Sequence, residues 1–104
     1  MSEARLLWVD GGLLPVGAAA VDPRDPGFTL GDGLFETMRA RGGAVLRIDR
    51  HLSRLRAGAA VLGLSPLPKD EELTDAIAGT LTANGLAEAA VRLTVSRGVP
   101  ARRD

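Results

Sequence analysis

The chain is organised around Phe28-Thr29-Leu30-Gly31-Asp32-Gly33-Leu34-Phe35-Glu36-Thr37-Met38-Arg39, a glycine-rich loop that leads into an alternating segment. Gly31 and Gly33 flank Asp32, so the backbone there can take a positive φ or approach another group closely. From Leu34 onward the residues alternate between two faces of a predicted strand. One face carries Leu34, Glu36, Met38 and Ala40, and the other carries Phe35, Thr37, Arg39 and Arg41.

The second face holds an aromatic ring, a hydroxyl and two guanidinium groups, which predicts one wall of a polar pocket. The same residues also fit a plain loop followed by an edge strand. Because an isolated Gly-x-Gly signal is weak, this stretch alone favours the edge strand.

The composition is typical of a small globular domain. The chain has 104 residues, of which 45% are hydrophobic, 25% charged and only 3% aromatic, so the core must be built mostly from Leu, Val, Ala and Ile. The 13 basic and 13 acidic residues balance, which argues against a nucleic-acid partner. Every cation except Lys69 is an arginine, a side chain suited to carboxylate and phosphate, although a GC-rich coding sequence gives the same bias.

Several kinds of site are excluded by the residue types. The chain has no cysteine, so it has no disulfide, thiol nucleophile or thiolate metal ligand. His51 is the only histidine, so one chain cannot form a multi-histidine metal site, and no metal is expected. Residues 1–5 are charged and no apolar run reaches membrane-spanning length. We therefore expect neither a signal peptide nor a membrane partner, and a cytoplasmic location.

The first half of the chain predicts two hairpins. Apolar runs at 6–9 and 13–16 flank Asp10-Gly11-Gly12, and Pro15 confines the second run to a strand edge or end. Residues 17–27 are expected to form a loop. Gly42-Gly43 predicts a turn after which residues 44–48 return as a strand.

The second half predicts two helices and a strand. Asp49 is the expected N-cap of a helix that ends at Gly63, and residues 65–68 are the expected connector. A further helix should begin near Lys69 and end at Asn84-Gly85. Their apolar stripes consist of Leu52, Leu55, Ala59 and Leu62, and of Leu73, Ile77 and Leu81. Residues 89–96 alternate as a strand, and residues 99–104 are expected to form a loop. This order predicts an α+β fold, an antiparallel sheet with two helices packed on one face.

Two arginines stand out as possible anion ligands. Arg54 lies just off the first apolar stripe, so it can reach an anion held between helix and sheet or remain a solvated charge. Arg97 ends the last strand beside Gly98 and could clamp a carboxylate or lie free on the surface. Asp32 is expected to cap a turn through its own backbone rather than act as a base. His51, one turn before Arg54, is expected to be a capping or packing residue.

Lys69 is informative by exclusion. It precedes Asp70, Glu71 and Glu72, and these carboxylates keep an ammonium group protonated. A nucleophilic lysine must lose that proton. Chemistry that needs such a lysine is therefore not expected from this chain alone.

Three motifs in order resemble one family. They are DPGFTLGDGLFET at 25–37, RIDRHLSRL at 47–55 and VRLTVSRG at 91–98. At this spacing they resemble the N-terminal domain of the class IV (fold type IV) pyridoxal-phosphate-dependent aminotransferases. That family includes D-amino-acid transaminases, branched-chain transaminases and aminodeoxychorismate lyases. The resemblance covers nearly the whole chain, and the first motif is closer to the lyase and D-amino-acid group, with a slight preference for the lyase.

The resemblance also implies site residues. Arg54 would bind the phosphate of pyridoxal 5′-phosphate, and Phe35 and Thr37 would line the substrate pocket. Arg97 would bind a substrate carboxylate and reach the site of a neighbouring subunit, which implies a homodimer. No residue of this chain matches a catalytic position.

Members of that family run well past this length and carry the Schiff-base lysine in a second domain. We therefore expect residues 1–104 to be the N-terminal small domain, without the C-terminal lysine domain and inactive alone. The intact enzyme would bind pyridoxal 5′-phosphate and an amino-acid-like substrate, and this portion alone would not retain the cofactor. The alternative is a stand-alone binding or dimerisation module without catalysis.

Overall fold

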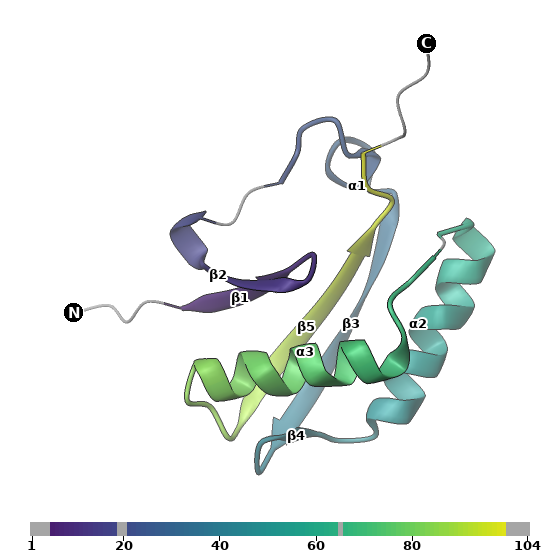
Figure 1. Cartoon of the computed structure of the whole chain (residues 1–104). Helices are drawn as coiled ribbons and strands as arrows, with labels where there is room; N and C mark the ends of the chain where they lie inside the picture. The colour runs from purple at the N-terminus through teal and green to yellow at the C-terminus, as the bar shows by residue number, and fades with distance from the viewer. Residues whose placement is uncertain (1–4, 19–20, 65, 100–104) are drawn as a thin grey trace.

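The computed structural model describes residues 5–18, 21–64 and 66–99, and these residues form the predicted α+β fold (Figure 1). In chain order the elements are β1 (Leu6–Val9), β2 (Gly12–Pro15), the short 3-10 helix η1 (Val16–Ala18), α1 (Pro26–Thr29), β3 (Gly33–Arg41), β4 (Ala44–Val45), α2 (Ile48–Leu62), α3 (Asp70–Ala83) and β5 (Ala89–Ser96). The expected contributions of residues 19–20 to the loop at 17–27, of Ser65 to the connector and of residues 100–104 to the last loop lie outside the described residues.

The strands form two antiparallel sheets rather than the single sheet expected. The β1–β2 hairpin stands apart, and the other sheet has the order β4-β3-β5. The edge-strand interpretation of residues 34–41 was therefore wrong, because β3 is the central strand. Its pairing with β5 runs from Gly33 opposite Ser96 to Ala40 opposite Ala89. A Cβ on Gly33 would lie 2.5 Å from the Val95 carbonyl oxygen, so this position needs glycine.

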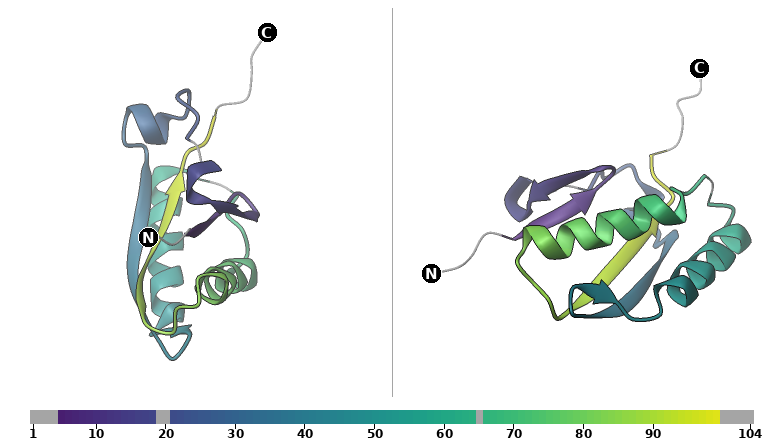
Figure 2. Two further views of the ribbon diagram at one scale, coloured as in Figure 1. Left: turned by 90° about the vertical axis from the view of Figure 1, so that its left-hand side faces the viewer. Right: turned by 60° about the horizontal axis from the view of Figure 1, so that its bottom comes forward.

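The alternation predicted along β3 is confirmed. Met38 and Ala40 are buried on the inner face. The residues of the other face are exposed, namely Phe35, Thr37, Arg39 and Arg41. Both helices pack against this inner face, where Met38 and Ala40 contact Ile77 and Leu81 of α3. A neighbouring cluster joins Leu52 and Leu55 of α2 to Leu73 of α3. Figure 2 shows α3 and the β1–β2 hairpin lying on one side of the sheet.

The segment between β3 and α2 differs from the prediction. β4 contains two residues instead of the expected five-residue strand at 44–48, because Arg47 adopts a left-handed conformation with φ of 55° and turns the chain into α2. Asp49 therefore does not cap the helix. It lies in the first turn, where a carboxylate is favoured by the helix dipole. The predicted end of α2 at Gly63 is confirmed.

The β1–β2 hairpin docks on the end of α3. Its turn residues Asp10 and Gly11 have φ of 47° and 100°, as expected for a tight hairpin turn. The Asn84 side chain accepts a hydrogen bond from the Leu6 N–H (2.9 Å) and donates one to the Leu6 carbonyl oxygen (3.0 Å). This pairing ties the first strand to the helix rather than to the main sheet.

The predicted loop at 17–27 contains short helical turns at both ends. Asp25 caps α1 by accepting a hydrogen bond from the Gly27 N–H (2.7 Å), and Pro26 follows at the first helical position. None of the helices in the described part of the chain has the length and apolar content needed to cross a bilayer.

Candidate functional site

A carboxylate on the inner face of the sheet organises the first part of the site. Glu36 lies between Leu34 and Met38 on β3, and its side chain is only 11% exposed. Arg54 of α2 donates from Nε to Oε2 (3.0 Å) and from Nη2 to Oε1 (2.9 Å). His51, one helical turn earlier, places Nδ1 2.8 Å from Oε1. The sheet and the helix are thus joined by a three-residue polar cluster, the Glu36 cluster (Glu36, His51, Arg54).

The charges within this cluster reinforce one another. Hydrogen bonds from Arg54 and then from His51 lower the pKa of Glu36, and Glu36 raises the pKa of Arg54. The carboxylate is therefore ionised at neutral pH. Because it can only accept hydrogen bonds, Nδ1 of His51 must carry a proton. The pairing gives His51 a more specific role than the capping or packing expected from sequence.

The sequence identified Arg54 and His51 but not Glu36. The available signal was an acidic residue at an inward position of an otherwise apolar strand face. A buried carboxylate needs a partner, and two hydrogen-bond donors three residues apart on a helix, an imidazole and a guanidinium, could supply it.

Part of the Arg54 guanidinium remains available for a ligand. Its side chain is 69% exposed, although one of its edges is held by Glu36. Among the described residues, none accepts a hydrogen bond from Arg54 Nη1. Nη2 also lies 3.4 Å from His51 Nδ1, but this nitrogen carries a proton toward Glu36 and so does not accept a hydrogen bond. Nη1 and the second hydrogen of Nη2 therefore form an open pair of donors. A guanidinium edge of this kind suits an oxyanion such as a phosphate, so the residues present fit the phosphate role that the resemblance implies.

The opposite face of the sheet carries the predicted pocket-wall residues. Phe35 is 52% exposed, and the Arg92 guanidinium lies over its ring, 4.0 Å from the centroid. Arg92 sits opposite Thr37 in the β3–β5 register, and Thr94 sits opposite Phe35. Arg92 also donates from Nε to the Thr94 hydroxyl (3.3 Å), so its guanidinium contacts both Phe35 and Thr94 on this face.

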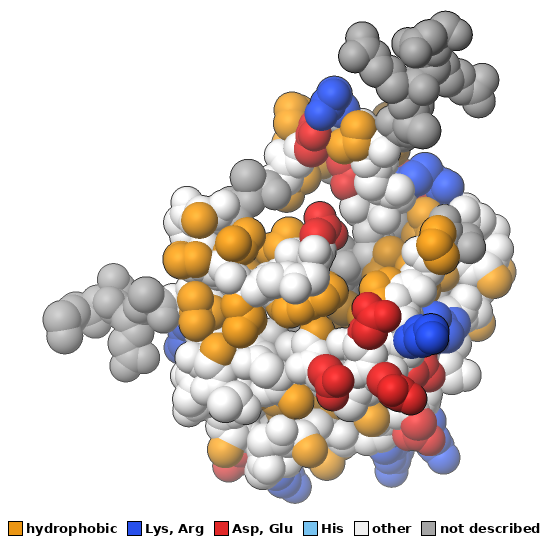
Figure 3. Space-filling view, viewed as in Figure 1, with side chains coloured by type: hydrophobic (Ala, Val, Ile, Leu, Met, Phe, Trp, Pro, Cys, Tyr) orange, Lys and Arg blue, Asp and Glu red, His pale blue; other side chains and the backbone are white. Residues whose placement is uncertain are grey.

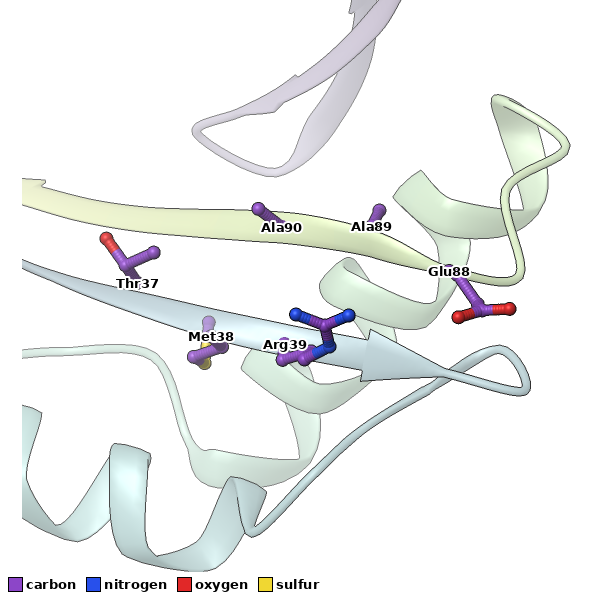
Figure 4. A pocket seen from close by; sticks show the side chains of 6 residues that line it. All are labelled: Thr37, Met38, Arg39, Glu88, Ala89 and Ala90. Atoms are coloured by element: carbon purple, nitrogen blue, oxygen red, sulfur yellow. The ribbon is translucent and has the colours of Figure 1, made fainter.

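Thr37 also borders an open, shallow pocket of about 450 Å³. Its other lining residues are Met38, Arg39, Glu88, Ala89 and Ala90. In Figure 4, Thr37 and Arg39 extend from one side of β3 and Met38 from the other. The structure thus separates these predicted site residues: Arg54 projects from α2 and binds Glu36 on the inner face of β3, whereas Phe35 and Thr37 lie on the outer face of that strand.

Arg97 is held by its own chain. Its Nε and Nη2 donate to the Asp32 carboxylate, with 3.1 Å from Nη2 to Oδ1, and Nη2 also donates to the Leu62 carbonyl oxygen (2.6 Å). A longer contact of 3.4 Å joins Nη1 to the Gly63 carbonyl oxygen. Asp32 raises the pKa of Arg97. A substrate carboxylate at Arg97 would have to compete with Asp32, which pairs with this arginine instead of capping its own turn as expected.

Asp25 is a second carboxylate that the sequence did not reveal. It is 8% exposed and accepts hydrogen bonds from the Ser96 hydroxyl (2.5 Å) and the Gly98 N–H (3.0 Å), in addition to its helix-cap bond. The Ser96 bond is the main cause of its lowered pKa. Asp25 and Arg97 together fasten the glycine-rich loop to the end of β5.

Comparisons with known proteins agree with the motifs. The model of the amino-transferase class IV family matches residues 33–104. A Methanocaldococcus jannaschii protein described as "Putative branched-chain-amino-acid aminotransferase" is 38% identical over 94 residues, which cover 89% of this chain and 32% of that protein. D-alanine aminotransferase from Bacillus licheniformis is 30% identical over 90% of this chain and 33% of its own length.

Solved structures give the same result. The branched-chain aminotransferase from the thermophilic archaeon Thermoproteus uzoniensis, solved with norvaline, is 32% identical with a TM-score of 0.78, over 86% of this chain and 32% of that one. A further branched-chain amino acid aminotransferase, complexed with N-(5′-phosphopyridoxyl)-L-glutamate, is 27% identical with a TM-score of 0.85. The 4-amino-4-deoxychorismate lyase from Pseudomonas aeruginosa is 35% identical with a TM-score of 0.71, over 92% of this chain and 33% of that one. The chain thus spans about a third of the length of these proteins. It belongs to the class IV aminotransferase family.

Proposed function

We propose that this chain provides the cofactor-phosphate ligand and one wall of the substrate site in a pyridoxal-phosphate-dependent aminotransferase or aminodeoxychorismate lyase. The observation that carries the proposal is the Arg54 guanidinium, oriented by Glu36 on one edge and open on the other. When bound, pyridoxal 5′-phosphate supplies an electron sink for an amino-acid-like substrate. The family's range of relatives supports the reaction class without choosing between transamination and lysis.

In this proposal the site residues of this chain bind or orient the cofactor and the substrate. Arg54 holds the phosphate with its outward donors and neutralises part of its charge. Phe35 and Thr37 present an apolar ring and a hydroxyl to the substrate from the outer face of the sheet. Arg97 would bind a substrate carboxylate in place of the Asp32 carboxylate. Its present pairing with Asp32 supports this role, because it places a carboxylate on the same guanidinium.

We propose that the lysine needed as the reactive amine of this enzyme lies outside residues 1–104. Lys69 is the only lysine of the sequence, and it lies exposed at the start of α3 beside three acidic residues. Figure 3 shows acidic side chains gathered over α3. We therefore propose that residues 1–104 act as the N-terminal small domain and are inactive by themselves.

We also propose that the enzyme is a cytoplasmic homodimer. Large apolar side chains lie open on the described surface, among them Leu30 (80% exposed) and Val61 (86%), and they support association with further protein surface. Size-exclusion chromatography with light scattering and cell fractionation would test these two points.

The test of the function is cofactor retention by Arg54→Ala in the full-length gene product. We expect the variant to lose pyridoxal 5′-phosphate during dialysis while its circular dichroism spectrum stays that of the wild type. Arg50→Ala is the matched control, because Arg50 is an exposed arginine of the same helix. Equal cofactor occupancy in Arg54→Ala and wild type would refute the phosphate role. A wild-type protein that binds no cofactor would favour the stand-alone binding module.

A further inference from the structure

We propose that Glu36 is the positioning residue of the cofactor-phosphate site, because it fixes the Arg54 guanidinium with its open edge outward. This inference rests on the proposed function, in which Arg54 binds the phosphate. It adds a residue that does not itself touch the cofactor, and it assigns that residue a measurable effect on phosphate binding.

The position of Glu36 is not explained by packing. Its neighbours on the inner face of β3 are Leu34 and Met38, and an apolar side chain there would join the same core. A carboxylate that is 11% exposed loses most of its hydration and must be compensated by partners. Apolar replacements of such buried ion pairs are often neutral or stabilising. A role beyond stability is therefore the better account of this residue.

The geometry indicates what that role is. Glu36 engages Nε and Nη2, the side-on edge of the guanidinium. The planar group then directs Nη1 and the remaining Nη2 hydrogen away from the sheet. Without the carboxylate, a side chain with 69% exposure would sample many rotamers. Ordering it before the ligand arrives removes that cost from binding.

His51 completes the arrangement by fixing the carboxylate itself. Its Nδ1 lies 2.8 Å from Oε1, the same oxygen that accepts from Arg54 Nη2. The imidazole is 19% exposed and thus well packed. Two side chains of α2, His51 and Arg54, therefore hold the Glu36 carboxylate and limit the rotation of its side chain.

The negative charge of Glu36 would by itself weaken phosphate binding, which is opposite to the effect of positioning Arg54. A second anion near Glu36 is repelled, so removal of the carboxylate would strengthen phosphate binding if charge dominated. Positioning and repulsion therefore predict opposite signs for the same substitution. The sign of the change decides between them.

The experiment compares pyridoxal 5′-phosphate with pyridoxal, which lacks the phosphate, on the full-length gene product. Dissociation constants are measured by absorbance for wild type, Glu36→Ala, Glu36→Gln and Arg54→Ala. Glu71→Ala is the control, because Glu71 is an exposed carboxylate on α3. We expect Glu36→Ala to weaken pyridoxal 5′-phosphate by about tenfold, the factor equivalent to about 1.4 kcal/mol, and pyridoxal much less. Glu36→Gln, which keeps an acceptor for Arg54, should lie between wild type and Glu36→Ala.

The outcomes separate this inference from the function on which it rests. If Arg54→Ala loses the phosphate preference and neither Glu36 variant does, the positioning role fails and the proposed function stands. If Arg54→Ala also keeps the wild-type preference, the proposed function fails. Equal losses for both ligands in Glu36→Ala would indicate a merely structural residue and overturn the inference. Should Glu36→Ala not fold, Glu36→Gln decides, together with the ³¹P resonance of the bound phosphate, which we expect to shift relative to wild type.

Discussion

Truncation of Leu55 to alanine should remove a large part of the stability of this domain. Leu55 is fully buried (0% exposed) in the cluster with Leu52 and Leu73, against which Leu34 and Leu93 also pack. At about 0.8 kcal/mol per buried methylene, the lost transfer free energy is about 2.4 kcal/mol. The cavity left between helices and sheet adds to this, so we expect a total of about 3 kcal/mol, within the range of about 2–5 kcal/mol for such substitutions.

The assay is equilibrium urea unfolding followed by circular dichroism. Leu55→Ala should lower the midpoint without changing the slope, because the loss lies in the native state. Arg50→Ala is the control, since Arg50 is an exposed residue of the same helix, and it should change the free energy of unfolding by less than about 0.5 kcal/mol. A loss below about 1 kcal/mol for Leu55→Ala would refute the assignment of this cluster as the core.

Two further predictions concern α3 and Glu36. Gly79→Ala should stabilise the protein by about 0.5–1 kcal/mol in thermal unfolding, because Gly79 is inside α3 and no atom beyond its neighbours and the surrounding helix backbone lies within 4 Å of the added Cβ; a lower melting temperature would contradict this. Because the pKa of Glu36 is lowered in the fold, its ionised form contributes stability above the ordinary carboxyl pKa that is lost as the pH falls through the folded-state pKa. Urea unfolding between neutral and acidic pH should therefore show a shallower loss of stability in Glu36→Gln than in wild type, and parallel curves would count against the ion pair.

Local patterns predicted most of the elements correctly. The alternation of β3 and β5 and the apolar stripes of α2 and α3 follow directly from residue spacing. Leu62 is the exception, because it was expected in the α2 stripe but is 41% exposed at the end of the helix. The misassignments arose where tertiary context decides. Nothing local to β3 shows that β5 will cover its edge, and Arg47 could not be expected in a left-handed conformation that ends β4 early and starts α2 ahead of Asp49.

The site was predictable only in part for a related reason. Arg54 lies at the margin of a helical stripe, which residue spacing reveals, whereas its partner Glu36 comes from another element. Asp32 and Arg97 are 65 positions apart, so no local pattern indicates that an internal carboxylate fills the predicted clamp. The Asp25–Ser96 bond spans 71 positions and was missed for the same reason. Side chains were thus identified by type, and their partners became evident only from the packing of helix, loop and sheet.

The proposed role of Arg54 is to bind the cofactor phosphate while Glu36 holds its guanidinium. A crystal structure of the full-length gene product with pyridoxal 5′-phosphate bound would test this role most directly. We expect a phosphate oxygen within about 3 Å of Arg54 Nη1, with Nε and Nη2 still on the Glu36 carboxylate. A phosphate bound elsewhere, with the open edge of Arg54 facing solvent, would contradict it.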